Sequence, residues 1–280
     1  MMIKQNPFSI YDFLGYFIPG ALVIYIFLII FNPSNTEDFV TFLGSNKILD
    51  FDNILFFVII SYSLGHLINF SSSITIERYA NWKYSFPSKY LMNLNPNHKY
   101  WIGPIKIKLW KGFLALIILP VAILDYILGE FFSFKEFYTK KADKFIVEMV
   151  KSKGLVLLEK LGAPVTESLR EYDFHRIFSH YVYENSKNHQ SKMTNYVTLY
   201  GFLRSLCLIS VLFFWFLLYK IIEGFGASNY DIKIMLTSIL FLTITSYLFF
   251  MAFMKFYRRY TLEALMLIVI DPDLKENSKS

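Results

Sequence analysis

The chain has 280 residues, of which 55% are hydrophobic and 19% aromatic, and its formal net charge is +6. Soluble domains are about 45–50% apolar, and here the apolar excess is gathered in long blocks, which argues against an ordinary soluble protein. The single cysteine, Cys207, excludes an intrachain disulfide and a thiolate metal cluster. The composition therefore predicts an integral membrane protein whose first partner is the lipid bilayer.

The first two apolar runs, 13–31 and 54–71, are each close to the ~20 residues that a helix needs to cross a bilayer. In the second run, Ser61, Gly65, Asn69 and Ser73 recur every four residues and so share one helical face. Small residues at this spacing let membrane helices approach closely. His66 lies in the same stretch. We therefore predict a helix that packs tightly on a neighbour.

The charges of the loops predict the orientation of the chain. Loop 32–53 carries Glu37, Asp38, Asp50 and Asp52 against Lys47 alone, whereas segment 72–111 is rich in lysine and arginine with Glu77 as its acid. Lysine and arginine accumulate on the cytoplasmic side of membrane proteins. We expect loop 32–53 outside, segment 72–111 inside and both termini in the cytoplasm.

Segment 112–128 leaves three alternatives open. The run is apolar but short, with Pro120 near its centre and Asp125 near its end. It could cross the membrane, form a re-entrant hairpin or lie buried against cytoplasmic elements. Four crossings satisfy every loop charge and are the topology we predict. Five crossings, with 112–128 as an extra span, are the alternative. Asp125 is expected to make a cap or an interfacial contact at a helix end.

The remaining chain completes an all-α, polytopic fold. Segment 130–198 mixes acids and bases, and we predict helices near 135–152, 154–162 and 166–185, with Thr166 as an N-cap. The last two spans are 200–222 and 234–254, followed by the basic stop KFYRRY. The predicted parts are a helix pair in 1–71, a basic helical cytoplasmic domain in 72–198, a second pair in 199–256 and a cytoplasmic tail in 257–280.

No motif predicts an enzyme, a metal or another cofactor. The five histidines include no pair at the i,i+4 spacing of a helical zinc site, and phosphate-binding and nucleophile motifs are absent. Arg170 and His175 match the loose R-x4-H pattern of HEPN ribonucleases. The pattern is short and common by chance, and a solvated helix face is the better explanation.

The polar residues of the spans are mild, and the candidates for helix packing or for a pore are Ser61, Gly65, His66, Asn69, Thr243 and Ser246. Hydroxyl and small residues serve close packing, and they also line water-filled pores. Because one subunit encloses no evident pathway, a pore would need a homo-oligomer with cyclic symmetry.

The basic cytoplasmic face predicts contact with an anion. Candidates for binding ligand or lipid phosphates are Arg78, Lys106, Lys108, Lys111, Lys140, Lys141, Arg170 and Arg176. Repeated around a symmetric oligomer, these side chains would form a positive basin. Headgroup contact combined with the topology signal is the simpler explanation.

Three groups of segments, 8–24, 63–79 with 86–88, and 200–208 with 255–265, resemble a family of bacterial four-span inner-membrane proteins. Proteins of this build resemble membrane effectors of anti-phage defence, such as the Hailong channel effector. The resemblance implies that a cytoplasmic region senses a nucleotide or oligonucleotide and that the spans disrupt the membrane.

These observations lead to one hypothesis and two rivals. The hypothesis is a homo-oligomeric channel or pore in the bacterial inner membrane, gated by an anionic ligand through the basic region. The first rival is a non-conducting anchor or scaffold that recruits a soluble partner protein through 130–198. The second rival is a membrane-tethered HEPN-like ribonuclease.

Overall fold

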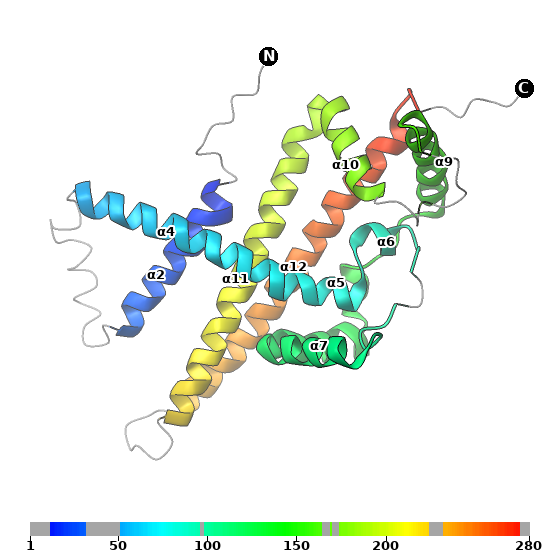
Figure 1. The fold of residues 1–280 in the computed structure, drawn as a ribbon. Helices are drawn as coiled ribbons and strands as arrows, with labels where there is room; N and C mark the ends of the chain where they lie inside the picture. Colours follow the sequence, from blue (N-terminus) through cyan, green and yellow to red (C-terminus); the bar gives the residue numbers. More distant parts are fainter. Residues whose placement is uncertain are drawn as a thin grey trace, which may run out of the picture.

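A computed structural model describes residues 12–31, 51–95, 98–163, 169, 174–223 and 232–274. These residues form helices and turns with no strand among them, which confirms the predicted all-α class (Figure 1). The elements are η1 (Phe13–Phe17), α2 (Ile18–Phe31), α4 (Phe51–Ser72), η2 (Ser73–Glu77), α5 (Arg78–Tyr84), α6 (Pro87–Leu91), α7 (Ile105–Ile117), α8 (Leu119–Leu124), η3 (Asp125–Phe131), η4 (Phe134–Phe137), α9 (Lys144–Lys160), α10 (Phe174–Asn185), η6 (Lys187–His189), α11 (Gln190–Glu223) and α12 (Ile232–Ile270).

Three helical stretches in the described part of the chain are long and apolar enough to cross a membrane: Ile54–Leu91, Lys187–Glu223 and Lys233–Ile270. A shorter apolar helix covers Phe13–Leu28, and the pair Ile105–Ile117 and Leu119–Phe131 passes the same test but is bent by 99°. Helices of this length and composition fit a membrane protein.

The long helices α11 and α12 pack along each other through the middle of the molecule (Figure 1). Both extend beyond the predicted spans 200–222 and 234–254. The basic cluster KFYRRY therefore lies inside α12 rather than after it. No proline interrupts α12 until Pro272, and the residue before a proline disfavours helix, so the chain stays helical to Ile270.

The second helix also continues past its predicted end at residue 71. α4 runs through the π-helical turn η2 into α5, which ends at Tyr84. Ser85, with φ 68°, breaks the helix just before Pro87. The boundary placed between 71 and 72 thus falls inside one continuous helix, because a change from apolar to polar residues does not by itself end a helix.

The continuous helix formed by η1 and α2 crosses α4 at two glycines. A Cβ at Gly20 would overlap the backbone of Ser61, and a Cβ at Gly65 would overlap the backbone of Tyr16. Only glycine permits this separation of the two helices. The small-residue face of 61–65 thus lies at the closest approach of α2 and α4.

Segment 112–128 is not a straight helix. α7 ends at Ile117, and α8 begins at Leu119 in a direction 99° away. Pro120 lies in the first turn of α8, where its missing N–H costs nothing, whereas inside a continuous helix its ring would clash with the carbonyl four residues earlier. A straight crossing is therefore excluded, and the bent form fits a re-entrant hairpin or a broken span.

The helices of segment 130–198 differ from the prediction. The predicted helices 135–152 and 154–162 are replaced by one helix, α9, which begins after the N-cap Asp143 and continues through Gly154. Gly154 does not break α9 because it packs on Phe178, where a Cβ would overlap the ring. α10 covers part of the predicted helix 166–185, and Thr166 lies outside the described residues.

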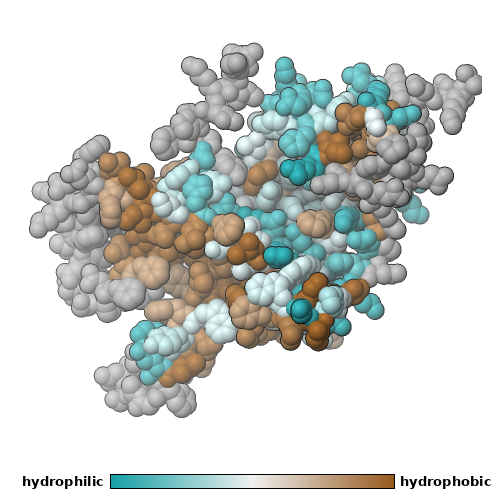
Figure 2. All heavy atoms as spheres, viewed as in Figure 1, coloured by the Kyte–Doolittle hydropathy of each residue, from teal (hydrophilic) through white to brown (hydrophobic). Residues whose placement is uncertain are grey.

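The buried apolar residues form two large cores along the long helix pair and a small one where α2, α4 and α11 meet. One core joins α6, α9 and α10 to the C-terminal half of α12, including Phe178 and Ile268. A second core joins α5, α7 and α8 to the middle of α11 and α12, including Ile118 and Phe250. Figure 2 shows hydrophobic side chains gathered over α2 and α4, and hydrophilic ones over the opposite end of α11 near α10.

Candidate anion-binding site

The most deeply buried charge of the described residues is the Asp125 carboxylate, at the start of η3 and 0% exposed. Its Oδ1 accepts hydrogen bonds from the hydroxyls of Tyr84 and Tyr138, both at 2.7 Å. Its Oδ2 accepts one from Tyr79 at 3.0 Å and pairs with Lys83 Nζ at 2.9 Å. A buried carboxylate is tolerated only when it is paired and hydrogen-bonded in this way.

A glycine one turn away leaves room for the hydrogen bonds to the Asp125 carboxylate. Gly129 lies one turn after Asp125, and a Cβ there would come within 2.6 Å of Asp125 Oδ1 and 3.0 Å of the Tyr138 hydroxyl. Burial and the adjacent carboxylate raise the pKa of Tyr138 well above its ordinary value of 10, so that its hydroxyl stays a donor at physiological pH. We call Asp125, Lys83, Tyr79, Tyr84 and Tyr138 the Asp125 cluster.

A cavity of about 670 Å³ adjoins the Asp125 cluster. Its charged lining consists of Lys83, Lys99, Lys135 and Lys141 against one acid, Glu130. The ammonium group of Lys83 also lies 3.3 Å from Glu130. Lysines 99, 135 and 141 have no ion pair or side-chain hydrogen bond within the described ranges. The cavity therefore has a net positive lining suited to an anion.

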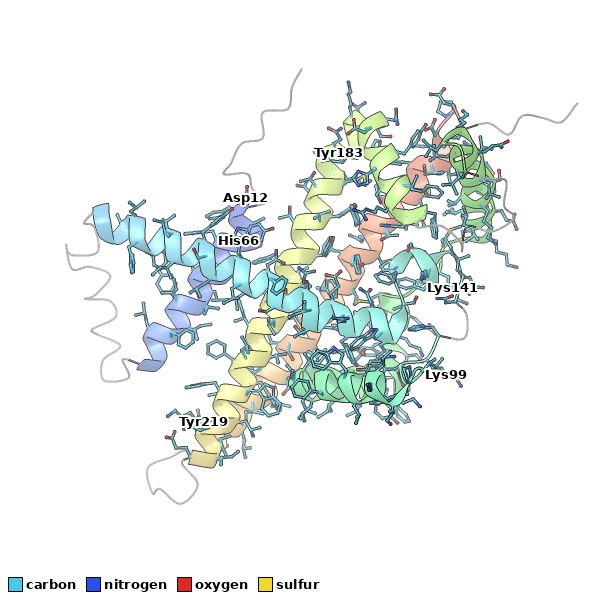
Figure 3. The ribbon with its side chains drawn as sticks, in the orientation of Figure 1. Asp12, His66, Lys99, Lys141, Tyr183 and Tyr219 are labelled. Atoms are coloured by element: carbon cyan, nitrogen blue, oxygen red, sulfur yellow. The ribbon has the colours of Figure 1, made fainter. Side chains whose placement is uncertain are left out.

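Polar and aromatic side chains complete the cavity. Asn93 and Asn95 contribute amides, and His98 Nε2 donates a hydrogen bond to the Trp82 carbonyl at 2.8 Å. Partial burial raises the pKa of Tyr100 to about 12, so this phenol also remains neutral. Figure 3 shows Lys99 and Lys141 at the same edge of the molecule, near α6 and α7. The arrangement offers ammonium and amide donors to phosphate or carboxylate oxygens.

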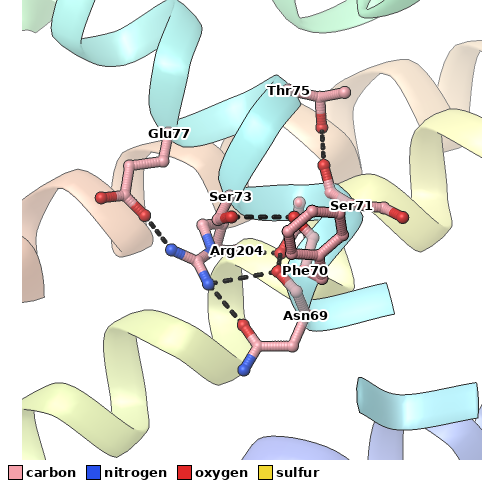
Figure 4. Close-up of polar contacts among 8 residues, drawn as sticks. Asn69, Phe70, Ser71, Ser73, Thr75, Glu77 and Arg204 are labelled. Atoms are coloured by element: carbon pink, nitrogen blue, oxygen red, sulfur yellow. Dashed lines mark hydrogen bonds and ion pairs between the residues drawn. The ribbon is translucent and has the colours of Figure 1, made fainter. Parts of the chain in front are cut away.

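A second polar cluster surrounds Arg204, whose side chain is 9% exposed on α11 (Figure 4). Its guanidinium forms an ion pair with Glu77 and donates to the side-chain oxygen of Asn69. Its Nε donates to the Ser72 hydroxyl at 3.0 Å, and one terminal nitrogen reaches the Asn69 carbonyl at 3.3 Å. These contacts, which we call the Arg204 cluster, fasten α4 and the π-helical turn η2 to α11.

The structure disperses the predicted phosphate-binding residues. Lys141 lines the cavity, and Lys140 is exposed beside it in the chain. Lys111 is buried, and its ammonium donates to the Tyr100 carbonyl at 2.6 Å and the Ile102 carbonyl at 3.0 Å. Because these carbonyls occupy its ammonium group, we leave Lys111 out of the proposed anion site.

The other predicted cations lie away from the cavity lining. Arg78 is exposed and stacks over the Trp82 ring at 5.1 Å. Lys106 and Lys108 are exposed on α7, and Arg176 is exposed on α10. Arg170 lies outside the described residues. The positive basin predicted from the sequence belongs to a symmetric oligomer, so it stays a prediction.

The predicted pore or packing residues make contacts between or within helices. Ser61 and Gly65 lie where α2 crosses α4, and His66 stacks on Tyr16 with ring centroids 3.9 Å apart. Thr243 and Ser246 donate to carbonyls of α12, at 2.8 Å and 2.9 Å. Asn69 belongs to the Arg204 cluster. Each of these contacts serves packing within the subunit.

Sequence reasoning missed the residues that build the site. The sequence predicts for Asp125 only a cap or an interfacial contact, and it treats Lys83 and Lys99 only as basic charges of segment 72–111 that indicate topology. One signal could have found them: an acid inside an apolar run needs a buried cation, and segment 72–111 supplies lysines flanked by tyrosines.

The described residues do not bring together the two side chains of the R-x4-H pattern. His175 is half-buried beside Tyr260, with ring centroids 6.2 Å apart, and Arg170 lies outside the described residues. In the described ranges, no group of three or more His, Cys, Asp or Glu side chains is placed to hold a metal ion.

Comparison of the chain with protein-family models, curated proteins and solved structures returned no match.

Proposed function

We propose that the protein is a homo-oligomeric channel or pore of the bacterial inner membrane, opened by an anionic ligand that binds in the cavity beside Asp125. A role as an effector of anti-phage defence, with a nucleotide or oligonucleotide as ligand, is the biological form of this proposal. No catalytic step belongs to it.

The proposed topology has four crossings with both termini in the cytoplasm. Residues 13–31, 54–71, 200–222 and 234–254 form the membrane portions, and α7 with α8 and η3 is a re-entrant hairpin on the cytoplasmic side. The lysines of segment 72–111 and of 130–198 then face the cytoplasm, as the distribution of basic residues in membrane proteins requires.

One observation carries the proposal: Lys83 belongs both to the cavity lining and to the buried Asp125 cluster. An anion in the cavity attracts the Lys83 ammonium and competes with Asp125 for it. Lys83 lies near the end of a continuous helix that begins at Phe51, so a shift of its position changes the packing of that helix.

This geometry supplies a route from ligand to membrane. The ligand stabilises the arrangement of α5 against η3 in which it contacts Lys83 better. This difference in affinity shifts the equilibrium between the two arrangements. The same helix is fastened to α11 by the Arg204 cluster and to η1 by the close approach at Gly65. The movement is thereby passed to several membrane helices.

Conductance tests the proposal. The purified full chain is reconstituted into planar bilayers of phosphatidylcholine, with and without phosphatidylglycerol, and current is recorded before and after adding ATP or a short oligoadenylate. We expect stepwise currents that depend on an anionic ligand. An assembled oligomer that conducts under none of these conditions overturns the proposal.

Matched variants test the site. The variant Lys99→Gln/Lys135→Gln/Lys141→Gln should lose the dependence on the anion. The control Lys144→Gln/Lys151→Gln/Lys187→Gln removes the same charge from exposed positions outside the cavity lining and should behave as the parent chain does. Equal effects of the two variants would show that net charge, not the cavity, controls the current.

Labelling tests the orientation. Cys207 is buried, and Cys207→Ser removes the native thiol. In that background a Lys106→Cys thiol, at an exposed position of α7, should react with a membrane-impermeant maleimide only from the cytoplasmic side. Reaction from the periplasmic side would invert the topology and reject the cytoplasmic ligand.

A further inference from the structure

An apolar groove of about 580 Å³ adjoins the cationic cavity. The two hollows share Ala115, Ala122 and Tyr126 in their linings. A third hollow, of about 450 Å³, shares Tyr126 and Glu130 with the cavity and Ile127 with the groove. The cavity and the groove both fall in the range of about 300–1,000 Å³ typical of ligand sites. They form neighbouring compartments around Tyr126.

The groove follows the 99° bend between α7 and the α8–η3 helix. Its lining has no charged or amide side chain, and Leu119, Ile123 and Ile127 supply aliphatic surface. Gly112, Ala115 and Ala122 are small, which leaves room above the helix backbones. Apolar chains gain free energy in such a groove in proportion to the surface that they bury.

The cavity has the opposite character. Its lining includes the lysines Lys99, Lys135 and Lys141, whose ammonium groups have no ion pair among the described residues, and the amides of Asn93 and Asn95. A ligand that fills both compartments must therefore carry an anionic group at one end and a hydrocarbon chain at the other.

The surface near the bend has the composition of a membrane–water interface. Trp101, just before α7, is 57% exposed, and Trp110 and Phe113 on α7 are 47% and 52% exposed. Lys106 and Lys108 are exposed on α7 as well. Tryptophan is enriched at the headgroup level of membranes, and lysines there attract anionic lipids. These residues favour a position of the cavity near the headgroups and of the groove near the acyl chains.

We infer that the cavity and the groove together bind an anionic membrane phospholipid, with its phosphate held by Lys99, Lys135 and Lys141 and one acyl chain in the groove at the α7–α8 bend. This inference rests on the anion site of the proposed function and names a phospholipid, in place of a soluble nucleotide or oligonucleotide, as the ligand of that cavity. It requires the cavity but not ion conduction.

Direct binding tests the inference independently of current. The detergent-solubilised full chain is titrated with dioleoyl phosphatidylglycerol or dioleoyl phosphatidylcholine, and bound lipid is counted by native mass spectrometry. We expect phosphatidylglycerol to bind at least about tenfold more tightly, because each lysine near a phosphate favours the anionic lipid. Equal binding of the two lipids overturns the inference.

Two variants separate the two compartments. Lys99→Gln/Lys141→Gln should lower the affinity for phosphatidylglycerol about tenfold, whereas the exposed control pair Lys144→Gln/Lys151→Gln should not. Gly112→Leu fills the groove, and the nearest atom to its Cβ is a Trp101 ring carbon at 4.0 Å, so the variant keeps the backbone in place. The variant should weaken the binding of dioleoyl phosphatidylglycerol but leave the binding of glycerol 1-phosphate unchanged.

Gly201→Leu is the control for Gly112→Leu, because a Cβ at Gly201 meets nothing within 4 Å and the residue lies on α11. Unchanged lipid affinity in Gly112→Leu would reject the acyl site. If ATP displaces bound lipid and the chain shows no preference for phosphatidylglycerol, the ligand of the cavity is a soluble nucleotide. That result would reject the lipid but leave the proposed anion site intact. Lipid binding without current would reject the channel alone.

Discussion

Two buried charges fasten the same helix, residues 51–84, to different neighbours, and they do so in different ways. Arg204 holds the helix to α11 through Glu77, Asn69 and Ser72. Asp125 holds its far end to η3 through Lys83 and tyrosine hydroxyls. Arg204 pairs with the Glu77 carboxylate and does not line the cavity, whereas Lys83 reaches Glu130 as well as Asp125 and also lines the cavity.

This difference separates a structural fastening from a site that can respond. The Arg204 cluster balances one cation against one anion, so a ligand has nothing to gain there. The Asp125 cluster shares its cation with a cavity of net positive lining. An anion can therefore change the contacts of Lys83 within the Asp125 cluster. The Arg204 cluster keeps the helix attached to α11 meanwhile.

The largest effect is expected from removing the Asp125 charge without changing its shape. Asp125→Asn leaves Lys83 buried without its main partner, which should lower the free energy of unfolding by about 3–5 kcal/mol. Unfolding by sodium dodecyl sulfate in mixed micelles measures it.

Asp143→Asn is the control for Asp125→Asn. Asp143 is exposed and caps α9 by accepting from the Phe145 N–H at 2.9 Å, and asparagine caps about as well as aspartate. A small loss in both variants would mean that Asp125 carries no buried charge.

Breaking the Arg204 cluster should cost less, because Glu77 keeps 23% of its side chain exposed. Arg204→Met should lower the free energy of unfolding by about 2–3 kcal/mol. The double variant with Glu77→Gln should cost less than the sum of the single variants, since the charge left behind is also removed.

The pair Lys220–Glu223 on the same helix is the reference for Arg204 and Glu77. Its side chains are 35% and 47% exposed, and exposed pairs couple by about 0.5 kcal/mol or less. Equal coupling energies in the two cycles would contradict the fastening role of Arg204.

Single hydrogen bonds to the carboxylate sharpen the comparison further. Tyr138→Phe removes one donor to Asp125 and should cost about 1.5–2 kcal/mol, in the lower part of the range of about 1.5–3 kcal/mol for hydrogen bonds to charged groups. Tyr183→Phe, at an exposed position on α10, should change stability by less than about 0.5 kcal/mol. The same micelle titration decides, and a larger cost at Tyr183 would contradict the prediction.

The smallest effect is expected from two neighbouring serines. Ser72 accepts from Arg204 and is buried, so Ser72→Ala should cost about 1 kcal/mol. Ser73 donates only to the Phe70 carbonyl at the exposed surface, so Ser73→Ala should be close to neutral (Figure 4). The difference between the two variants is the measured quantity, and a zero difference would remove Ser72 from the cluster.

The sequence predicted the membrane helices better than their ends. Apolar runs reveal where a helix can contact lipid, and three of the predicted spans lie inside long apolar helices. Helix ends depend on breakers: α12 continues to Ile270, just before Asp271 and Pro272, and α5 stops at Ser85. The polar flanks of the spans carried no information about these ends.

The candidate site was the harder part. Lys111 and Lys108 look alike in the sequence, yet the first donates to two buried carbonyls and the second is exposed. Lys83 acquires its role only because the bend before Pro120 brings Asp125 to α5. Among the predicted phosphate-binding residues, Lys141 is the one found in the cavity lining.

The order of apolar and charged residues along the chain determined an all-helical fold with helices long and apolar enough to cross a membrane, because the transfer of side chains between water and lipid depends on residue type. Which lysine pairs with an acid, which contacts a carbonyl and which is left for an anion was decided by tertiary structure. Those outcomes depend on distances between α5, α7 and η3, and such distances follow from packing and from a 99° bend rather than from local sequence.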